Sequence, residues 1–117
     1  MNSHPYLQDF IKECTESIPK TSGEKFIGWE GLVYVLVTEG LKILLPELKE
    51  WVKLGVNFIV MKRLEIKKRL ESYAMKKELD FPAAEKAATA VANNITENNI
   101  DKLIQALEGK KATYSKR

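Results

Sequence analysis

Apolar residues recur three or four positions apart along much of the chain, and this spacing places their side chains on one face of an α-helix. Two runs follow it closely, one near each end of the chain: Leu7, Phe10, Ile11 and Cys14, and Ile100, Leu103, Ile104 and Leu107. Pro5 suits the first turn of the first helix, and Gly109 suits the position just after the other. Both runs predict amphipathic helices, with Ser3 or His4 as the expected cap of the first.

The segment from Leu32 to Leu45 is the most ambiguous part of the pattern. Its first residues, 32–37, favour a strand by residue type, but they contain no polar position that would give strand alternation. A helix instead gathers one continuous apolar face, made of Val33, Leu36, Val37, Gly40, Leu41 and Leu44. The spacing therefore predicts a helix, with a strand over residues 32–37 as the alternative.

The stretch from Glu47 to Leu79 contains no proline and has Gly55 as its one glycine. Its apolar positions partly repeat every seven residues, as in an imperfect coiled coil. An unbroken helix of this length would measure roughly 50 Å at 1.5 Å per residue, whereas a compact chain of this size is about 35 Å across. The helix should therefore either bend near Gly55 and Asn57 or pack its protruding half against another copy of the protein.

A further helix is predicted after residue 80, because Asp80 can cap it and Pro82 can occupy its first turn. Alanines recur through residues 83–92 and favour a helix. Thr96 is expected to cap the helix that follows.

Together these patterns predict an all-α fold: a small helical domain of about five helices with one long central helix. We expect a single helical domain over residues 1–109, with a loop at residues 18–23 around Pro19. Residues 110–117 should form a flexible basic tail, because they have almost nothing to bury. The composition fits one domain, since the 117 residues are 44% hydrophobic and 30% charged.

Cysteine and histidine are too scarce for most metal and redox sites. Cys14 is the single cysteine and His4 the single histidine, which leaves no disulfide and no zinc-ligand set. We therefore expect no metal, no cofactor and a reducing, cytoplasmic location. Cys14 is expected to be a core residue, because it belongs to an apolar stripe. Charged residues interrupt the most apolar stretch, 27–45, so no membrane span is expected.

No arrangement of residues in the sequence predicts catalysis. Acidic pairs such as Glu47 and Glu50 would be neighbours on a helix, but acid–base chemistry needs buried or closely opposed carboxylates. Gly23, Gly28 and Gly31 lack the spacing of a phosphate-binding loop. We therefore expect a non-enzymatic protein with no catalytic residue and no small-molecule substrate.

The net charge of +3 is unevenly distributed. Between residues 62 and 77 basic side chains outnumber Glu65 and Glu71; they are Lys62, Arg63, Lys67, Lys68, Arg69, Lys76 and Lys77. Such a helix could follow a phosphate backbone, which makes nucleic-acid binding the alternative function. A solvated helix face is the simpler explanation, because Glu65 lies at helical spacing from several of these cations.

The main functional hypothesis is helical assembly, in which the protein acts as an adaptor or a homo-oligomer through helix–helix contacts. The interface expected on the long helix consists of Ile59, Ile66, Leu70 and Tyr73. A third hypothesis is attachment to a membrane surface, with aromatic and apolar side chains acting beside the basic stretch. Those side chains are Phe26, Ile27, Trp29, Leu32 and Tyr34.

Overall fold

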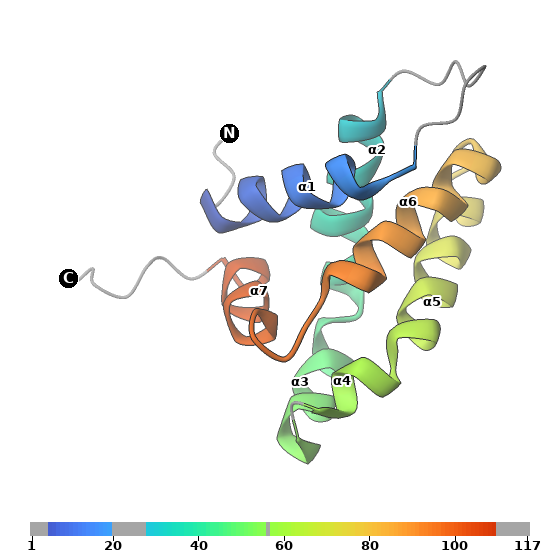
Figure 1. Cartoon of the computed structure of the whole chain (residues 1–117). Coiled ribbons are helices and arrows are strands. Elements are labelled where there is room, and N and C mark those ends of the chain that lie inside the picture. The colour runs from blue at the N-terminus through green and yellow to red at the C-terminus, as the bar shows by residue number, and fades with distance from the viewer. Residues whose placement is uncertain (1–4, 20–27, 56, 110–117) are drawn as a thin grey trace.

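Helices account for almost all of the chain that the computed structural model describes, which is residues 5–19, 28–55 and 57–109. In chain order they are α1 (Pro5–Ser17), α2 (Trp29–Val35), the π-helix η1 (Leu36–Leu41), α3 (Leu45–Leu54), α4 (Asn57–Met61), α5 (Arg63–Lys76), α6 (Phe81–Asn94) and α7 (Ile100–Leu107) (Figure 1). The described residues contain no strand, so the all-α prediction is confirmed. The helices are shorter and more numerous than predicted.

α1 and α7 form where the apolar spacing predicts them, and both apolar stripes are buried. Before α7, the Thr96 hydroxyl oxygen accepts hydrogen bonds from the backbone N–H groups of Asn98 and Asn99 at 3.2 Å. Thr96 thus stabilises the turn that leads into α7, and the helix itself begins at Ile100. Gly109 follows α7 with a φ of +78°, as expected for a glycine that ends a helix.

The segment 32–45 is helical, as predicted, but it is not one uniform α-helix. α2 passes into the π-helix η1 at Leu36, and a turn at Leu44 precedes α3. The predicted apolar face of this segment is buried throughout. Gly40 lets η1 lie close to α5, because a Cβ at this position would come within 2.8 Å of the Leu70 side chain.

The prediction of one long central helix is wrong, because the stretch 47–79 is interrupted at Gly55 and again at Lys62. Gly55 adopts φ +138° and ψ +134°, a region that residues with a side chain rarely enter. Beyond the interruptions, Arg69 of α5 reaches back to Glu47 of α3, with nitrogen and oxygen atoms 2.6 Å apart. Of the two alternatives left open by the sequence, the bend near the glycine is the one observed.

α6 crosses the middle of the fold and packs against α1, α2 and α5 (Figure 1). Its alanines are all buried, and their small side chains let the neighbouring helices approach closely. The predicted cap is confirmed, since the Asp80 carboxylate accepts a hydrogen bond from the Ala83 N–H at 3.2 Å. Near the other end of α6, Arg63 of α5 donates two hydrogen bonds to the Ile95 carbonyl at 2.8 and 3.2 Å.

Buried apolar side chains from every described helix form one hydrophobic cluster. α7 contributes by packing against α1 and α3. The described chain measures 48 × 31 × 24 Å along its principal axes. The predicted caps Ser3 and His4, residues 20–23 of the predicted loop and the predicted tail at 110–117 lie outside the described residues.

Candidate functional site

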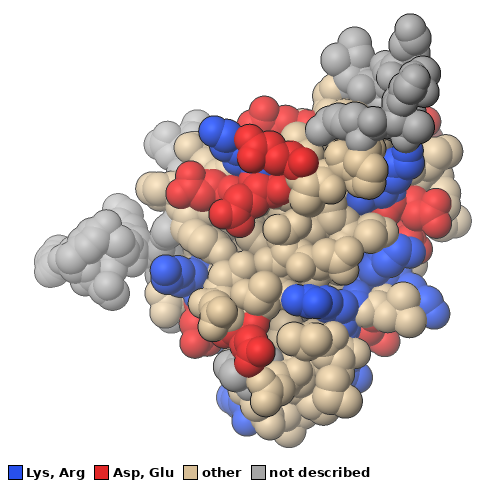
Figure 2. Space-filling model, in the orientation of Figure 1, with Lys and Arg blue, Asp and Glu red and all other residues tan. Residues whose placement is uncertain are grey.

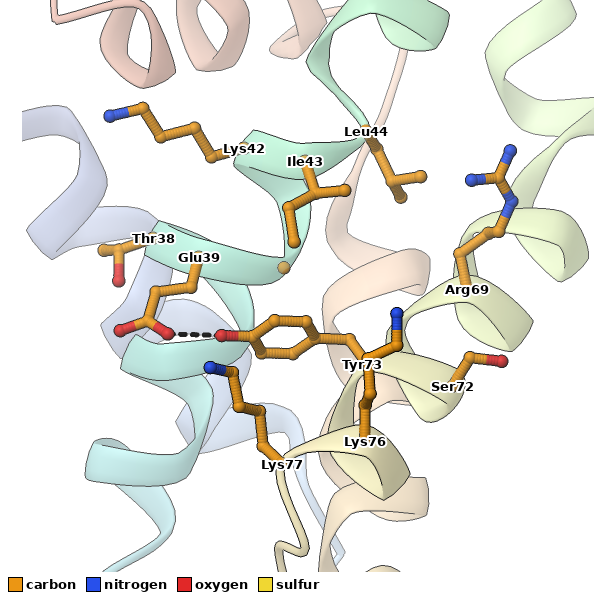
Figure 3. Close-up of a pocket in the computed structure, with 11 residues that line it drawn as sticks. Thr38, Glu39, Lys42, Ile43, Leu44, Arg69, Ser72, Tyr73, Lys76 and Lys77 are labelled. Carbon is orange, nitrogen blue, oxygen red and sulfur yellow. Dashed lines mark hydrogen bonds between the residues drawn. The ribbon is translucent and has the colours of Figure 1, made fainter.

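A hollow of about 750 Å³ lies between the η1 segment and α5, and we refer to it as the η1–α5 groove (Figure 3). Its two walls consist of Thr38, Glu39, Gly40, Lys42, Ile43 and Leu44 on one side and Arg69, Ser72, Tyr73, Lys76 and Lys77 on the other. On α5 the lining positions 72 and 73 each lie three or four residues from 69 and from 76, so a single face of that helix supplies them.

The backbone of η1 determines how closely the two walls approach. π-helical turns are rare, and they occur frequently at functional sites. Gly40 adds no side chain to this wall, and a Cβ there would lie 3.6 Å from the Tyr73 ring as well as against Leu70. The Tyr73 ring therefore packs beside the η1 backbone and forms part of the groove surface.

Tyr73 is held in place by a hydrogen bond that crosses the groove. Its phenolic O–H donates to the Glu39 carboxylate of η1 (Figure 3). This hydrogen bond, with burial and the negative charge of Glu39 as further causes, raises the pKa of Tyr73 to about 12. The Lys77 ammonium lies 5.8 Å from the centre of the same ring, in cation–π contact. Tyr73 is consequently a neutral, fixed part of the wall at physiological pH.

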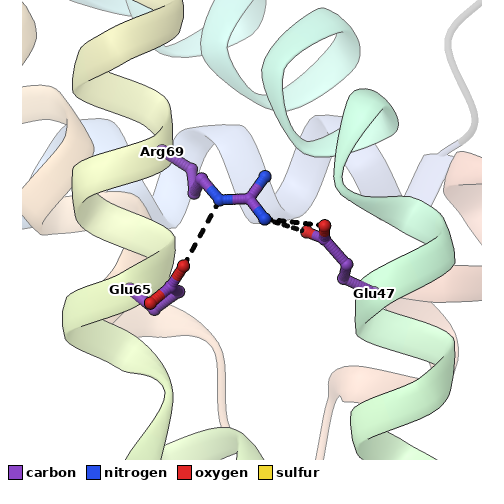
Figure 4. A network of polar contacts seen from close by, with 3 residues as sticks. All are labelled: Glu47, Glu65 and Arg69. Atoms are coloured by element: carbon purple, nitrogen blue, oxygen red, sulfur yellow. Dashed lines mark hydrogen bonds and ion pairs between the residues drawn. The ribbon is translucent and has the colours of Figure 1, made fainter.

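Arg69 lines the groove, but its charge is compensated within the chain. One terminal nitrogen of its guanidinium lies 2.6 Å from both carboxylate oxygens of Glu47, and its Nε lies 3.4 Å from Glu65 (Figure 4). The hydrogen bond to Glu47 is the largest of the influences that raise the Arg69 pKa. Since these groups are partly exposed, such a pair contributes at most about 1 kcal/mol to stability. Its clearest role is to join α5 to α3.

The other cations of the groove are less constrained. Lys42 and Lys76 are exposed, and within the described part of the chain neither forms an ion pair. Beside them Ile43 leaves 63% of its surface exposed, an unusual position for a large aliphatic side chain. Figure 3 shows Ile43 pointing toward the Tyr73 ring, with the Lys76 amino group on the Arg69 side of that ring. The groove thus combines an apolar surface with uncompensated positive charge.

The chemistry available in the groove is that of binding. It offers ammonium groups, the aliphatic hydroxyls of Thr38 and Ser72, and one carboxylate that already accepts a hydrogen bond from Tyr73. Among the described residues no group of three or more His, Cys, Asp and Glu side chains is arranged to hold a metal ion. Cys14 is buried in the core, far in sequence from the residues that line the groove.

The residues predicted to form an oligomer interface lie mostly inside the molecule. Ile59, Ile66 and Leu70 are fully buried in the core of this chain, and Tyr73 is partly buried in the η1–α5 groove. The heptad-like spacing identified a buried face correctly but did not show that its neighbours come from the same chain. Assembly stays a prediction, and Ile59, Ile66 and Leu70 are not accessible to a partner in this fold.

The predicted basic residues are spread over several faces, and most contact other groups of the chain. The Lys62 ammonium lies 5.4 Å from the Trp51 ring centre and 5.3 Å from that of Phe58. Lys67 pairs with Glu71 at 2.6 Å. The contacts of Arg63, Arg69 and Lys77 are those described above. Within the described chain only Lys68 and Lys76 of this set make no such contact. Nucleic-acid binding stays a prediction.

A surface that the sequence analysis missed lies where α3, α4 and α5 meet. Leu54, Val60, Met61 and Leu64 are 68%, 41%, 73% and 61% exposed, and we call these four residues the apolar corner. Figure 2 shows a mostly uncharged surface at the lower end of the molecule, where α3 and α4 lie in Figure 1. One feature of the sequence could have revealed the apolar corner: between residues 51 and 61 the apolar positions surround the helix instead of forming one stripe.

The residues of the membrane hypothesis do not form a common exposed surface among those described. Leu32 is buried, Trp29 packs partly against the core and Tyr34 is partly exposed, while Phe26 and Ile27 lie outside the described residues. No helix in the described part of the chain combines the length and apolar character needed to cross a bilayer.

Comparisons with protein families, with curated proteins and with solved structures gave no match to this chain.

Proposed function

We propose that this protein is a non-enzymatic helical assembly or adaptor protein, and that it binds a second copy of itself or another helical protein through the apolar corner. The observation that supports this most directly is the exposure of Leu54, Val60, Met61 and Leu64 around a single junction of helices. Exposed apolar surface gathered in this way is typical of interaction sites, whereas isolated exposed apolar residues are common on any protein.

The junction itself favours a contact of this kind. Trp51 and Phe58 lie beside the corner and are only partly buried, with the Lys62 ammonium near both rings. Large apolar and aromatic groups are typical of interface centres. Covering the four corner side chains would remove apolar surface from water, with a gain of about 25 cal/mol for each Å² covered.

The test is the oligomeric state of the full chain, measured by sedimentation equilibrium over a wide concentration range. We expect the wild type to self-associate, and we expect Met61→Lys and Leu64→Lys each to weaken association at least about tenfold, because each places a charge in the contact. Met75→Lys is the matched control: Met75 is 63% exposed on α5 but lies in its last turn, away from the corner.

Association that responds equally to all three substitutions would contradict the corner as the interface. A wild type that stays monomeric at every concentration would rule out self-assembly.

A cytoplasmic location belongs to the same proposal, and the lone, buried Cys14 supports it. Nucleic-acid binding has less support, because most of the basic residues of α5 contact other groups of the chain.

A further inference from the structure

We infer that the η1–α5 groove is a binding site for a small amphipathic anion, meaning one carboxylate or phosphate group carried on an apolar body. This inference goes beyond the proposed assembly function and is independent of it, because none of the four residues of the apolar corner lines the groove.

The first argument is charge. Four basic side chains line the groove, namely Lys42, Arg69, Lys76 and Lys77, while Glu39 is the one acidic residue in the lining. Arg69 is neutralised by Glu47 and Glu65, and Glu39 keeps its negative charge while it accepts the Tyr73 hydrogen bond. The three lysines of the lining still outnumber Glu39, so the groove has an excess of positive charge that an anionic group would compensate.

The second argument is the apolar surface that the same groove contains. Ile43 is largely exposed in the groove and points toward the Tyr73 ring (Figure 3). A free inorganic ion would leave this surface in contact with water, whereas an aliphatic or aromatic body would cover it. The two requirements together select a ligand with a charged end and an apolar end.

The third argument is size and rigidity. A volume of about 750 Å³ lies within the range of small-molecule sites, roughly 300–1,000 Å³. Both walls are held in place before a ligand binds, because Tyr73 is hydrogen-bonded to Glu39 and Arg69 forms an ion pair with Glu47 of α3. Less ordering is then needed on binding, which favours affinity. A nucleic-acid strand would instead use cations along the whole helix, including Lys68 outside the groove.

The experiment is a titration of the ¹⁵N-labelled full chain, followed by the backbone amide signals of residues 38–44 and 69–77. The probes are octanoate, octanol and inorganic phosphate. We expect octanoate to shift these signals in a saturable way, and octanol and phosphate to bind at least about tenfold more weakly, because each supplies only one of the two features.

Two pairs of substitutions make the test specific. Lys76→Gln should weaken octanoate binding about threefold or more, while Lys68→Gln, an exposed lysine of the same helix that does not line the groove, should leave it unchanged. Ile43→Ser should also weaken it, while Met75→Ser should not, although both side chains are 63% exposed. Each replaced side chain is exposed, so the fold should be retained.

Several results would overturn the inference. They are the absence of saturable shifts, equal affinity for octanoate and octanol, equal affinity for octanoate and phosphate, shifts confined to residues 54–64, and equal effects of the two lysine substitutions. A single-stranded oligonucleotide that bound more tightly than octanoate and also required Lys68 would likewise contradict a small-molecule site.

Discussion

The Cys14 thiol lies in the hydrophobic core of the fold, on the inner face of α1. Burial, and to a smaller extent the charge of Glu13, raises the pKa of this thiol to about 12. The thiolate is the nucleophilic form of cysteine, so very little of it is present in the folded protein at neutral pH. Cys14 therefore behaves as a small apolar residue, as its position on the predicted stripe indicated.

We expect iodoacetamide to modify Cys14 at least about a hundredfold more slowly in the folded protein at neutral pH than in urea, where the thiol is exposed. Mass spectrometry of samples taken over time measures both rates. Because the chain contains no other cysteine, one adduct reports on one site. Comparable rates in the two states would show that the core around α1 opens readily.

Tyr73 provides a pH-dependent contribution to stability. Its pKa in the folded protein is about 12 against a usual value near 10, so the folded state holds the phenolic proton more tightly than the unfolded state. The stabilisation is complete below pH 10 and is lost as the pH rises toward 12. The hydrogen bond to Glu39 is the first cause, so removing its acceptor should lower the Tyr73 pKa.

The near-ultraviolet absorbance of the phenolate measures this titration. We expect Tyr73→Phe to remove absorbance change from the region near pH 12, and we expect Glu39→Gln to move part of that change to lower pH. Tyr6, whose pKa is also raised to about 12, stays in both variants and serves as the internal reference. If Tyr73→Phe removed only the absorbance change near pH 10, the hydrogen bond from Tyr73 to Glu39 would be absent in solution.

Among the helices, α2 and η1 contain two glycines with opposite surroundings. A Cβ added at Gly31 of α2 would meet no atom within 4 Å, whereas one added at Gly40 of η1 would press on Leu70, which is fully buried. Glycine inside a helix costs about 0.5–1 kcal/mol relative to alanine, so alanine helps wherever space allows. Extra volume in a packed core costs about 1–3 kcal/mol.

We therefore expect Gly31→Ala to stabilise the protein by about 0.5–1 kcal/mol and Gly40→Ala to destabilise it by about 1 kcal/mol or more. Urea unfolding followed by circular dichroism gives both free energies of unfolding. A Gly40→Ala protein as stable as the wild type would mean that η1 and α5 can separate without cost, and the groove would then not be rigid.

The helices themselves were largely predictable from local spacing. The stripes of α1 and α7, the face from Val33 to Leu44 and the Asp80 cap all agree with the structure, because each depends on residues one or two helical turns apart. The sequence left a bend near Gly55 as one of two alternatives, because periodic apolar residues continue on both sides of this glycine. The break depends on the backbone angles of one residue, which spacing alone does not reveal.

The two surfaces of interest could not be predicted, because each brings together residues that are far apart in sequence or that change neighbours at a break. The η1–α5 groove joins residues 38–44 to residues 69–77, and it depends on the π-helical turn and on the close approach at Gly40. The apolar corner exists only because the chain turns between α3 and α5. On a continuous, protruding helix, the side chains of Ile59 and Ile66 would have been exposed, as the predicted interface required.

In the whole molecule, the folded-back helices remove the protruding rod that first suggested assembly. Arg69 holds α5 to α3, and the residues expected on the outside of the rod are inside the core. The case for a partner now depends on the apolar corner. The corner includes Leu64 in the first turn of α5, whereas the groove lies along the second half of that helix, from Arg69 to Lys76. Leu64 and Lys76 are twelve residues apart, about 18 Å along the helix, and the two surfaces share no residue, so both can be occupied together.

The central place of α6 also bears on how the protein is made. α1 is synthesised before α6 and α7, two of the helices that pack against it. Until those two helices have been synthesised, the side chains of Phe10 and Ile11 lack much of their native surroundings. The nascent chain therefore exposes the apolar face of α1 until the alanine-rich helix α6 has been synthesised and can pack against it.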